Sequence, residues 1–90
     1  MLRMTRAESG RVTTIFVEGK ILAPWIPEIR AAIAAIPHGH RYRIDVARVT
    51  FVDSAGAELL ATLQRDGIEI ASCSQFIAEL VQRAARNALR

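Results

Sequence analysis

The segment Phe51–Leu60, FVDSAGAELL, carries an aspartate, a serine and a glycine between two apolar runs. Residues 42 to 49 before it alternate apolar and polar side chains, as a half-buried strand does. Residues 55 to 64 after it space their leucines along one face of a helix. A strand therefore ends and a helix begins at Asp53 and Ser54.

Alternating strands and helices are predicted for the rest of the chain as well. The expected strands are 3 to 7, 11 to 18, 42 to 49 and 68 to 71, and the expected helices are 24 to 36, 55 to 64 and 74 to 88. Gly19 is expected to end the second strand. This pattern, ββαβαβα, predicts an α/β fold in which a small mixed sheet of about four strands carries about three main helices, mostly on one face.

Several single residues are assigned to packing. Trp25 is expected to close the rim of the core rather than to anchor a partner. Cys73 is expected to be a small buried side chain rather than a reactive thiol. Ser74 is a candidate cap of the last helix. The inward side chains of that helix are expected to be Phe76, Ile77, Leu80, Val81 and Ala84.

The composition indicates one soluble, cytoplasmic domain. Ninety residues, 51% hydrophobic and 23% charged, fit one globular domain over residues 1–90. The single cysteine excludes an internal disulfide. The N-terminus has no signal-peptide core, and no apolar run approaches the roughly 18 residues of a membrane-spanning helix.

The charge balance does not favour a nucleic-acid surface. Twelve Lys and Arg stand against nine Asp and Glu, for a net charge of +3. The cations are spread along the chain, and the aromatic residues are few: one Trp, one Tyr and three Phe. A basic patch with stacking rings, as single-stranded nucleic acids require, is therefore not predicted.

Catalysis is not predicted either. The strand-turn-helix at Ser54 is similar to a nucleophile elbow, but Val52 stands where that motif requires its first glycine. His38 and His40 lie in a short loop, where solvation is expected rather than pairing with a nucleophile. The sequence has no phosphate-binding glycine loop and no metal-ligand spacing, so neither a metal nor a cofactor is expected.

Two interpretations of the turn remain. Asp53 or Ser54 could cap the following helix, and Gly56 would let that helix lie close to the sheet or to a partner. Alternatively, the turn is a recognition site, because ligands and partners of α/β folds gather at the carboxyl ends of strands. A phosphate on Ser54 would add about −1.5 to −2 charges at a helix N-terminus, which tolerates anions.

Residues 44 to 60, IDVARVTFVDSAGAELL, resemble the central signature of the STAS domain, the module of sulfate transporters and anti-sigma-factor antagonists. That signature has an apolar-Asp-apolar strand, a Thr-Phe-Ile/Val-Asp-Ser turn and an amphipathic helix that contains glycine. Residues 17 to 29, VEGKILAPWIPEI, are similar to the family's upstream strand, turn and first helix. Residues 67 to 81, GIEIASCSQFIAELV, are similar to its last strand and helix.

The resemblance implies a protein-binding module rather than an enzyme. In the antagonist branch the unphosphorylated domain binds an anti-sigma factor, often itself a serine kinase, and phosphorylation just after the turn's Asp breaks the complex. Ser54 is then the expected phosphate acceptor, because Ala55 has no hydroxyl. The implied partner-binding residues are Gly19, Lys20, Asp53, Ser54, Ala55 and Gly56.

The sequence departs from the family pattern in the upstream turn. Where members often carry Gly-Glu-Leu-Asp, residues 19 to 22 read Gly-Lys-Ile-Leu, so both acidic residues are absent. Lys20 could pair instead with a phosphate on Ser54 or with an acidic partner. The alternative function is that of an accessory subunit, without phosphorylation, on the ATPase of a membrane transporter.

Overall fold

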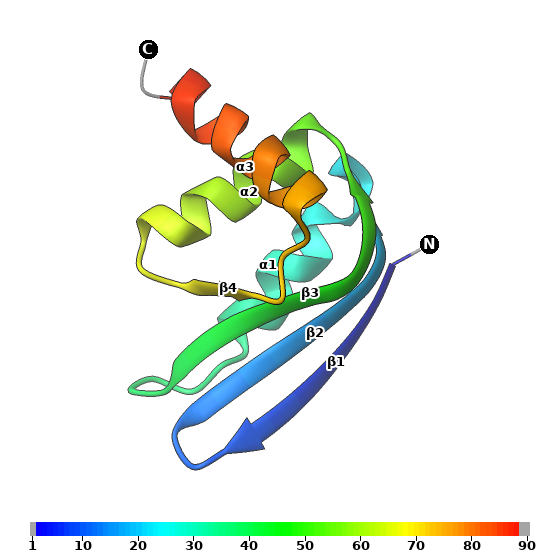
Figure 1. Ribbon diagram of the computed structural model, residues 1–90. Coiled ribbons are helices and arrows are strands. Elements are labelled where there is room, and N and C mark those ends of the chain that lie inside the picture. Colours follow the sequence, from blue (N-terminus) through cyan, green and yellow to red (C-terminus); the bar gives the residue numbers. More distant parts are fainter. Residues whose placement is uncertain (1, 89–90) are drawn as a thin grey trace.

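The computed structural model describes residues 2–88, in which one four-stranded sheet carries the helices on one side (Figure 1). The elements are β1 (Leu2–Ser9), β2 (Val12–Ile21), the 3₁₀ turn η1 (Ala23–Trp25), α1 (Ile26–Ala34), β3 (Arg41–Val52), α2 (Ser54–Arg65), β4 (Glu69–Ala71) and α3 (Gln75–Ala88). The predicted ββαβαβα order and α/β class are confirmed.

The strands lie in their sequence order, β1-β2-β3-β4. The β1–β2 hairpin is antiparallel, whereas β2–β3 and β3–β4 are parallel. The parallel pairs are connected through α1 and α2, because a parallel pair requires a crossover. As a result, the carboxyl ends of β2 and β3 meet at one edge of the sheet, with Ile21 opposite Val52.

The prediction that Gly19 ends the second strand is wrong. β2 continues to Ile21, and its register with β3 shifts between Phe16 and Glu18 and again between Gly19 and Lys20. Gly19 has φ 98°, a left-handed conformation that glycine adopts without steric cost. The glycine therefore marks an irregularity within the strand and not its end, as glycine in a strand often does.

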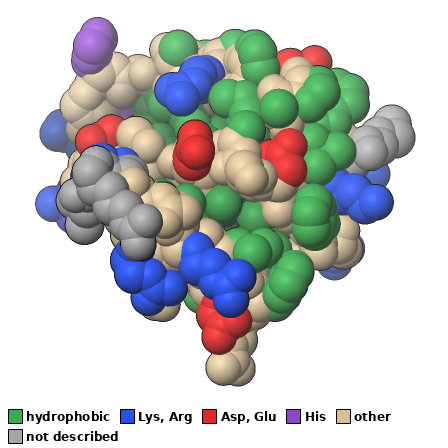
Figure 2. All heavy atoms as spheres, turned by 90° about the horizontal axis from the view of Figure 1, so that it is seen from above, with side chains coloured by type: hydrophobic (Ala, Val, Ile, Leu, Met, Phe, Trp, Pro, Cys, Tyr) green, Lys and Arg blue, Asp and Glu red, His purple; other side chains and the backbone are tan. Residues whose placement is uncertain are grey.

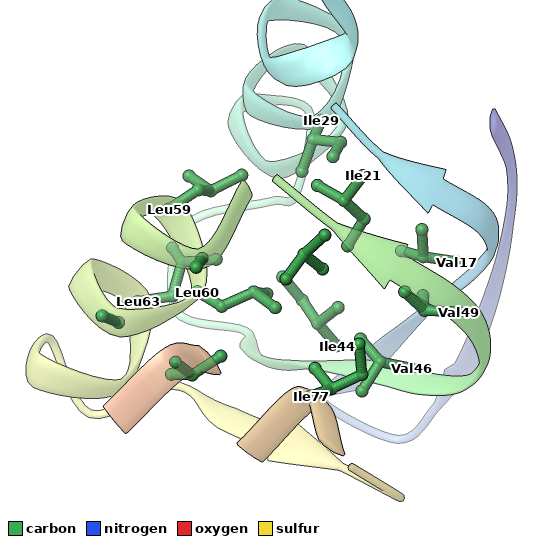
Figure 3. Close-up of a cluster of buried hydrophobic side chains, with 14 of the residues drawn as sticks. Val17, Ile21, Ile29, Ile44, Val46, Val49, Leu59, Leu60, Leu63 and Ile77 are labelled. Carbon is green, nitrogen blue, oxygen red and sulfur yellow. The ribbon is translucent and has the colours of Figure 1, made fainter. Parts of the chain in front are cut away.

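The core lies between the sheet and the three α-helices, where side chains from all of these elements point toward one another (Figure 3). The largest fully buried apolar side chains are Ile15, Val17, Ile21, Ile29, Ile44, Val46, Leu60 and Ile77. Burial of each such side chain contributes about 1.5–3 kcal/mol before conformational entropy is counted. The apolar stripes predicted for the helices therefore meet one face of the sheet.

The side chain of Phe76 corrects one predicted core position. It is 55% exposed, whereas its neighbour Ile77 and the residue one turn later, Val81, are buried. α3 therefore rotates its Ile77–Val81 stripe toward the core and leaves Phe76 at the side of that stripe. The predicted cap of this helix is confirmed, because Ser74 Oγ accepts a hydrogen bond of 3.2 Å from the backbone N–H of Ile77.

Across residues 2–88, none of the helices has both the length and the apolar character that crossing a bilayer requires.

Candidate functional site

Asp53 is the residue that fixes the turn between β3 and α2. It is the N-cap of α2, and its Oδ1 accepts a hydrogen bond of 2.8 Å from the N–H of Gly56. Its Oδ2 accepts a second bond of 2.8 Å from the N–H of Ala23, at the start of η1. The backbone N–H of Asp53 donates to the carbonyl of Ile21 over 3.2 Å. One residue therefore joins the ends of two strands to the starts of two helical segments.

This geometry resolves the question of which residue caps the helix. Asp53 has extended backbone angles and the capping bond, whereas Ser54 is the first residue of α2. The side chain of Ser54 is exposed, and Ala55 beside it is half-buried. The carboxylate of Asp53 therefore holds the turn, whereas the hydroxyl of Ser54 makes no hydrogen bond to the described residues 2–88.

Gly56 lies where the start of α2 packs closely against the end of β2. A Cβ on this residue would lie 2.9 Å from Cγ2 of Ile21 and still closer to its backbone carbonyl oxygen. Because glycine has no Cβ, the start of α2 can lie against the end of β2, as predicted for this residue. Gly56 is buried, so its part in any docking surface is to position the turn rather than to touch a partner.

Gly19 and Lys20 lie on β2, at the same edge of the sheet as the turn. Lys20 is exposed and opposite Phe51 on β3, and Gly19 is half-buried and opposite Val49. The carbonyl of Gly19 accepts a hydrogen bond of 3.3 Å from Oγ1 of Thr50. The parallel pairing of β2 with β3 therefore brings both residues to the strand ends where Asp53 begins the turn.

A hollow of about 480 Å³ opens beside Ser54, between α2 and α3. Its apolar lining includes Phe51, which is 40% exposed, and the half-buried Leu80. Its polar lining includes Glu58 of α2 and Arg83 of α3. In Figure 2, which looks onto this end of the molecule, hydrophobic side chains cover much of the right half, and a group of Lys and Arg side chains lies below the centre.

Sequence reasoning did not find this hollow. The alternation of β3 could have identified Phe51 as an outward residue next to the turn. The positions of Leu80 and Arg83 depend on how α3 packs against α2, and this packing cannot be predicted from a local sequence pattern.

The two histidines lie at the other end of β3 from Asp53. The backbone N–H of His40 donates to Pro37, and the next residue, Arg41, begins β3. His38 is exposed as expected, but the prediction that His40 is solvated is wrong, because it is half-buried and its Nδ1 is buried without a hydrogen-bond partner among residues 2–88. β3 is twelve residues long, so neither imidazole can serve Ser54 as a base.

Trp25 and Cys73 are both half-buried. Cys73 packs against the hydrophobic core, although it is less buried than predicted, whereas the predicted place of Trp25 at the rim of the core stays a prediction. Burial raises the pKa of the Cys73 thiol above its usual value, and a raised pKa reduces the thiolate fraction on which reactivity depends.

The comparison with protein families matches residues 4–90 to the family described as "Mlab, STAS domain". The chain belongs to the STAS family. A search of curated proteins found no match. The resemblance of residues 44 to 60 to the STAS signature is thereby confirmed, and the sheet and helices described above agree with a STAS fold.

The STAS domain is a protein-interaction and regulatory module, and the family is generally not enzymatic. Its signature turn in this chain is the Asp53–Ser54 turn, which lies at the carboxyl ends of the parallel strands β2 and β3. An exposed, unused hydroxyl next to a firmly held carboxylate and an apolar hollow is a surface suited to recognition.

Proposed function

We propose that this STAS domain is an anti-sigma-factor antagonist whose docking surface lies around Ser54. The proposed partner is an anti-sigma factor of the serine-kinase type, and the proposed phosphate acceptor is Ser54. The observation that carries the proposal is that Ser54, the first residue of α2, is exposed and is not the cap, and that its hydroxyl has no hydrogen bond within residues 2–88. Residues 1–90 are proposed to act as one cytoplasmic domain in bacterial transcription control.

The position of Ser54 suits a modification that changes the surface without unfolding the protein. A phosphate would add about −1.5 to −2 charges near the N–H groups at the start of α2, where negative charge is tolerated. The Asp53 cap, which holds the turn, would remain in place. Lys20 on the neighbouring strand is the candidate cation for pairing with that phosphate. The proposed docking residues are Gly19, Lys20, Asp53, Ser54, Ala55 and Gly56. Gly56 is buried, so it contributes by holding the start of α2 against β2 and not by contact with the partner.

Ser54→Asp is expected to weaken binding of the partner at least about tenfold, or about 1.4 kcal/mol, while the domain stays folded. The added carboxylate mimics part of the phosphate charge, and an acid in the first turn is favourable for the helix. The measurement is a quantitative pull-down from the native cell, read by mass spectrometry, with wild type, Ser54→Ala and Ser54→Asp side by side. Circular dichroism of each variant controls for folding.

An anti-sigma or kinase-like partner that is retained by Ser54→Ala and lost by Ser54→Asp would support the proposal. A folded Ser54→Asp variant that binds its partners at wild-type strength would refute the phosphate switch.

A second candidate is an accessory subunit on the ATPase of a membrane transporter, acting without phosphorylation. Two observations favour it. The matching family carries the description Mlab rather than that of an anti-sigma-factor antagonist. Ala55 and the Lys20–Leu22 segment also lack the second hydroxyl and the acidic residues that antagonists commonly carry. Transporter subunits that co-purify equally with wild type and Ser54→Asp would select this candidate.

A further inference from the structure

β1 forms an open edge of the sheet. It pairs with β2 along all eight of its residues without a shift of register, and within residues 2–88 no strand lies on its other side. Figure 1 shows it at the margin of the sheet, on the side away from β4. β1 contains no proline and is longer than the average strand of about five to six residues. The backbone N–H and C=O groups along its outer edge can therefore pair with a further strand.

The second half of β1, Thr5–Ser9, is exposed on both faces of the sheet. All five of its side chains are exposed, whereas Leu2 and Met4 in the first half pack against the hydrophobic core. Successive side chains of a strand point to opposite faces, so no helix covers either face of Thr5–Ser9. A strand added along this segment therefore has space on both faces.

The order of side chains in Thr5–Ser9 is complementary to itself when two copies run antiparallel. The segment reads Thr-Arg-Ala-Glu-Ser, so a twofold axis at Ala7 places each Arg6 opposite Glu8 of the second copy. The same axis places each Thr5 opposite Ser9 of the second copy, and the two small Ala7 side chains opposite each other. Opposite-charge pairs and hydroxyl pairs both stabilise antiparallel strands. Every side-chain pair in this register is therefore compatible.

Other registers lack this match. Residues that lie opposite each other in antiparallel strands share a face of the sheet, so the twofold axis of a symmetric pair passes through a single residue position. An axis at Arg6 or at Glu8 places like charges opposite each other, which is unfavourable. An axis at Thr5 places Arg6 opposite Met4 and forms no opposite-charge pair. The charges of β1 therefore favour the axis at Ala7.

The charged side chains have capacity for a second partner. Within one chain Arg6 donates from Nε and Nη2 to the same oxygen, Oε1 of Glu8, over 3.2 and 2.6 Å. Among residues 2–88, neither Nη1 of Arg6 nor Oε2 of Glu8 makes a hydrogen bond. A guanidinium and a carboxylate can each serve two partners. Two arginines and two glutamates can therefore alternate in a ring around the axis.

Two further cations lie near this segment and limit the affinity. Arg3 lies opposite Glu18 of β2, whose carboxylate offsets its charge. Arg11 lies in the turn that leads from β1 to β2, and in the Ala7 register this turn is level with Arg3 of the second copy. A ladder of five residues is also small beside stable interfaces, which bury about 1,200 Å² or more, so we expect a Kd on the order of tens of micromolar.

We propose that β1 pairs with β1 of a second copy of this chain, antiparallel about a twofold axis at Ala7, and so joins two four-stranded sheets into one. The proposed function around Ser54 is not required for this pairing. Ser9 lies opposite Val12 at the start of β2, whereas the Asp53–Ser54 turn follows the other end of the parallel strands. The dimer therefore presents two such turns, and a partner with two binding sites would gain avidity.

The register is tested by disulfide crosslinking in the full chain. Cys73 is first replaced by Ala, and Ala7→Cys, Thr5→Cys and Ser9→Cys are made separately in that background, with circular dichroism as the control for folding. Oxidised glutathione is the oxidant. Ala7→Cys is expected to crosslink to itself at least about tenfold faster than the other two, because only position 7 lies opposite itself. The two copies of position 5 are about 13 Å apart along the strands, beyond the reach of a disulfide.

The matched control uses the same two outer positions in another combination. A mixture of Thr5→Cys chains with Ser9→Cys chains is expected to give dimers linked from position 5 to position 9, although each chain alone crosslinks slowly. This result would show that slow crosslinking of the separate chains comes from their register and not from poor access of the oxidant.

Charge variants test the complementarity, with the dimer measured by sedimentation equilibrium. Arg6→Glu and Glu8→Arg are each expected to weaken the dimer at least about tenfold, because each places like charges opposite each other. The double variant Arg6→Glu with Glu8→Arg is expected to dimerise like the wild type, and an equimolar mixture of the two single variants is expected to form a heterodimer. Arg30→Glu, an exposed position on α1, is the control and is expected to change the Kd less than about twofold.

The proposal is overturned if the chain remains monomeric up to about 1 mM, roughly tenfold or more above the expected Kd. It is also overturned if Thr5→Cys or Ser9→Cys crosslinks to itself as fast as Ala7→Cys, or if the single charge variants dimerise like the wild type. A dimer formed through another surface would fail both arms. The result is separable from the phosphate switch: if the dimer forms as described and Ser54→Asp leaves partner binding unchanged, the pairing of β1 stands and the switch fails.

Discussion

Gly56→Ala is expected to lower the free energy of unfolding by about 3 kcal/mol, although alanine is the better helix former by about 1 kcal/mol. The new Cβ would lie 2.9 Å from Cγ2 of Ile21 and closer still to the backbone carbonyl oxygen of that residue. That carbonyl also accepts the hydrogen bond from Asp53 N–H. Relief of the overlap therefore requires α2 to move away from β2 and strains the turn. Urea denaturation followed by circular dichroism measures the loss.

Gly67→Ala is the matched control for this prediction. Gly67 has φ 88°, and a Cβ added to it would meet nothing within 4 Å, so alanine there introduces backbone strain but no steric overlap. The expected cost is about 1–2 kcal/mol. A Gly56→Ala variant at least as stable as wild type would show that helix propensity outweighs the close approach of α2 to β2.

Asp53→Ala is expected to lower the free energy of unfolding by about 2–3 kcal/mol. The substitution removes the cap bond to Gly56, worth about 0.5–2 kcal/mol, and the bond to the N–H of Ala23. Asp53→Asn is expected to cost about 1 kcal/mol, because an amide has one oxygen and can accept from only one of the two N–H groups. Thermal or urea unfolding of both variants checks this order.

Ser54→Ala is the matched control for the Asp53 pair. Its side chain is exposed and is not the cap, so its stability should stay within about 0.5 kcal/mol of wild type. If Ser54→Ala destabilised the domain as much as Asp53→Ala, the hydroxyl would be part of the fold, and its availability to a kinase would be in question.

These two stability predictions bear on the proposed function. Asp53 and Gly56 hold the turn, and Ser54 is the residue of the turn that remains free to be changed. A charge added at Ser54 can therefore alter the docking surface while the cap and the close approach of α2 to β2 stay intact. The hollow beside Ser54 extends the same surface onto α3, where the exposed Arg83 lies beside Leu80 and Ala84.

The candidate site was only partly predictable. The signature residues Asp53, Ser54 and Gly56 are consecutive or nearly so, and local capping chemistry identifies them. Gly19 and Lys20 could be included only through the family resemblance, because more than thirty residues separate them from the turn. Phe51, Leu80 and Arg83 were missed as lining residues, since they meet only when α3 packs beside α2.

The sequence by itself determined the order of the elements and the strand-to-helix turn at Asp53, because apolar periodicity and turn chemistry are local properties. It could not determine how far β2 continues beyond Gly19, because that depends on pairing with β3. Tertiary packing alone placed Phe76 in solvent and kept Ile77 in the core, since both positions fit an apolar stripe. It also chose Asp53 over Ser54 as the cap, because the second bond of that carboxylate goes to Ala23, thirty residues earlier in the chain.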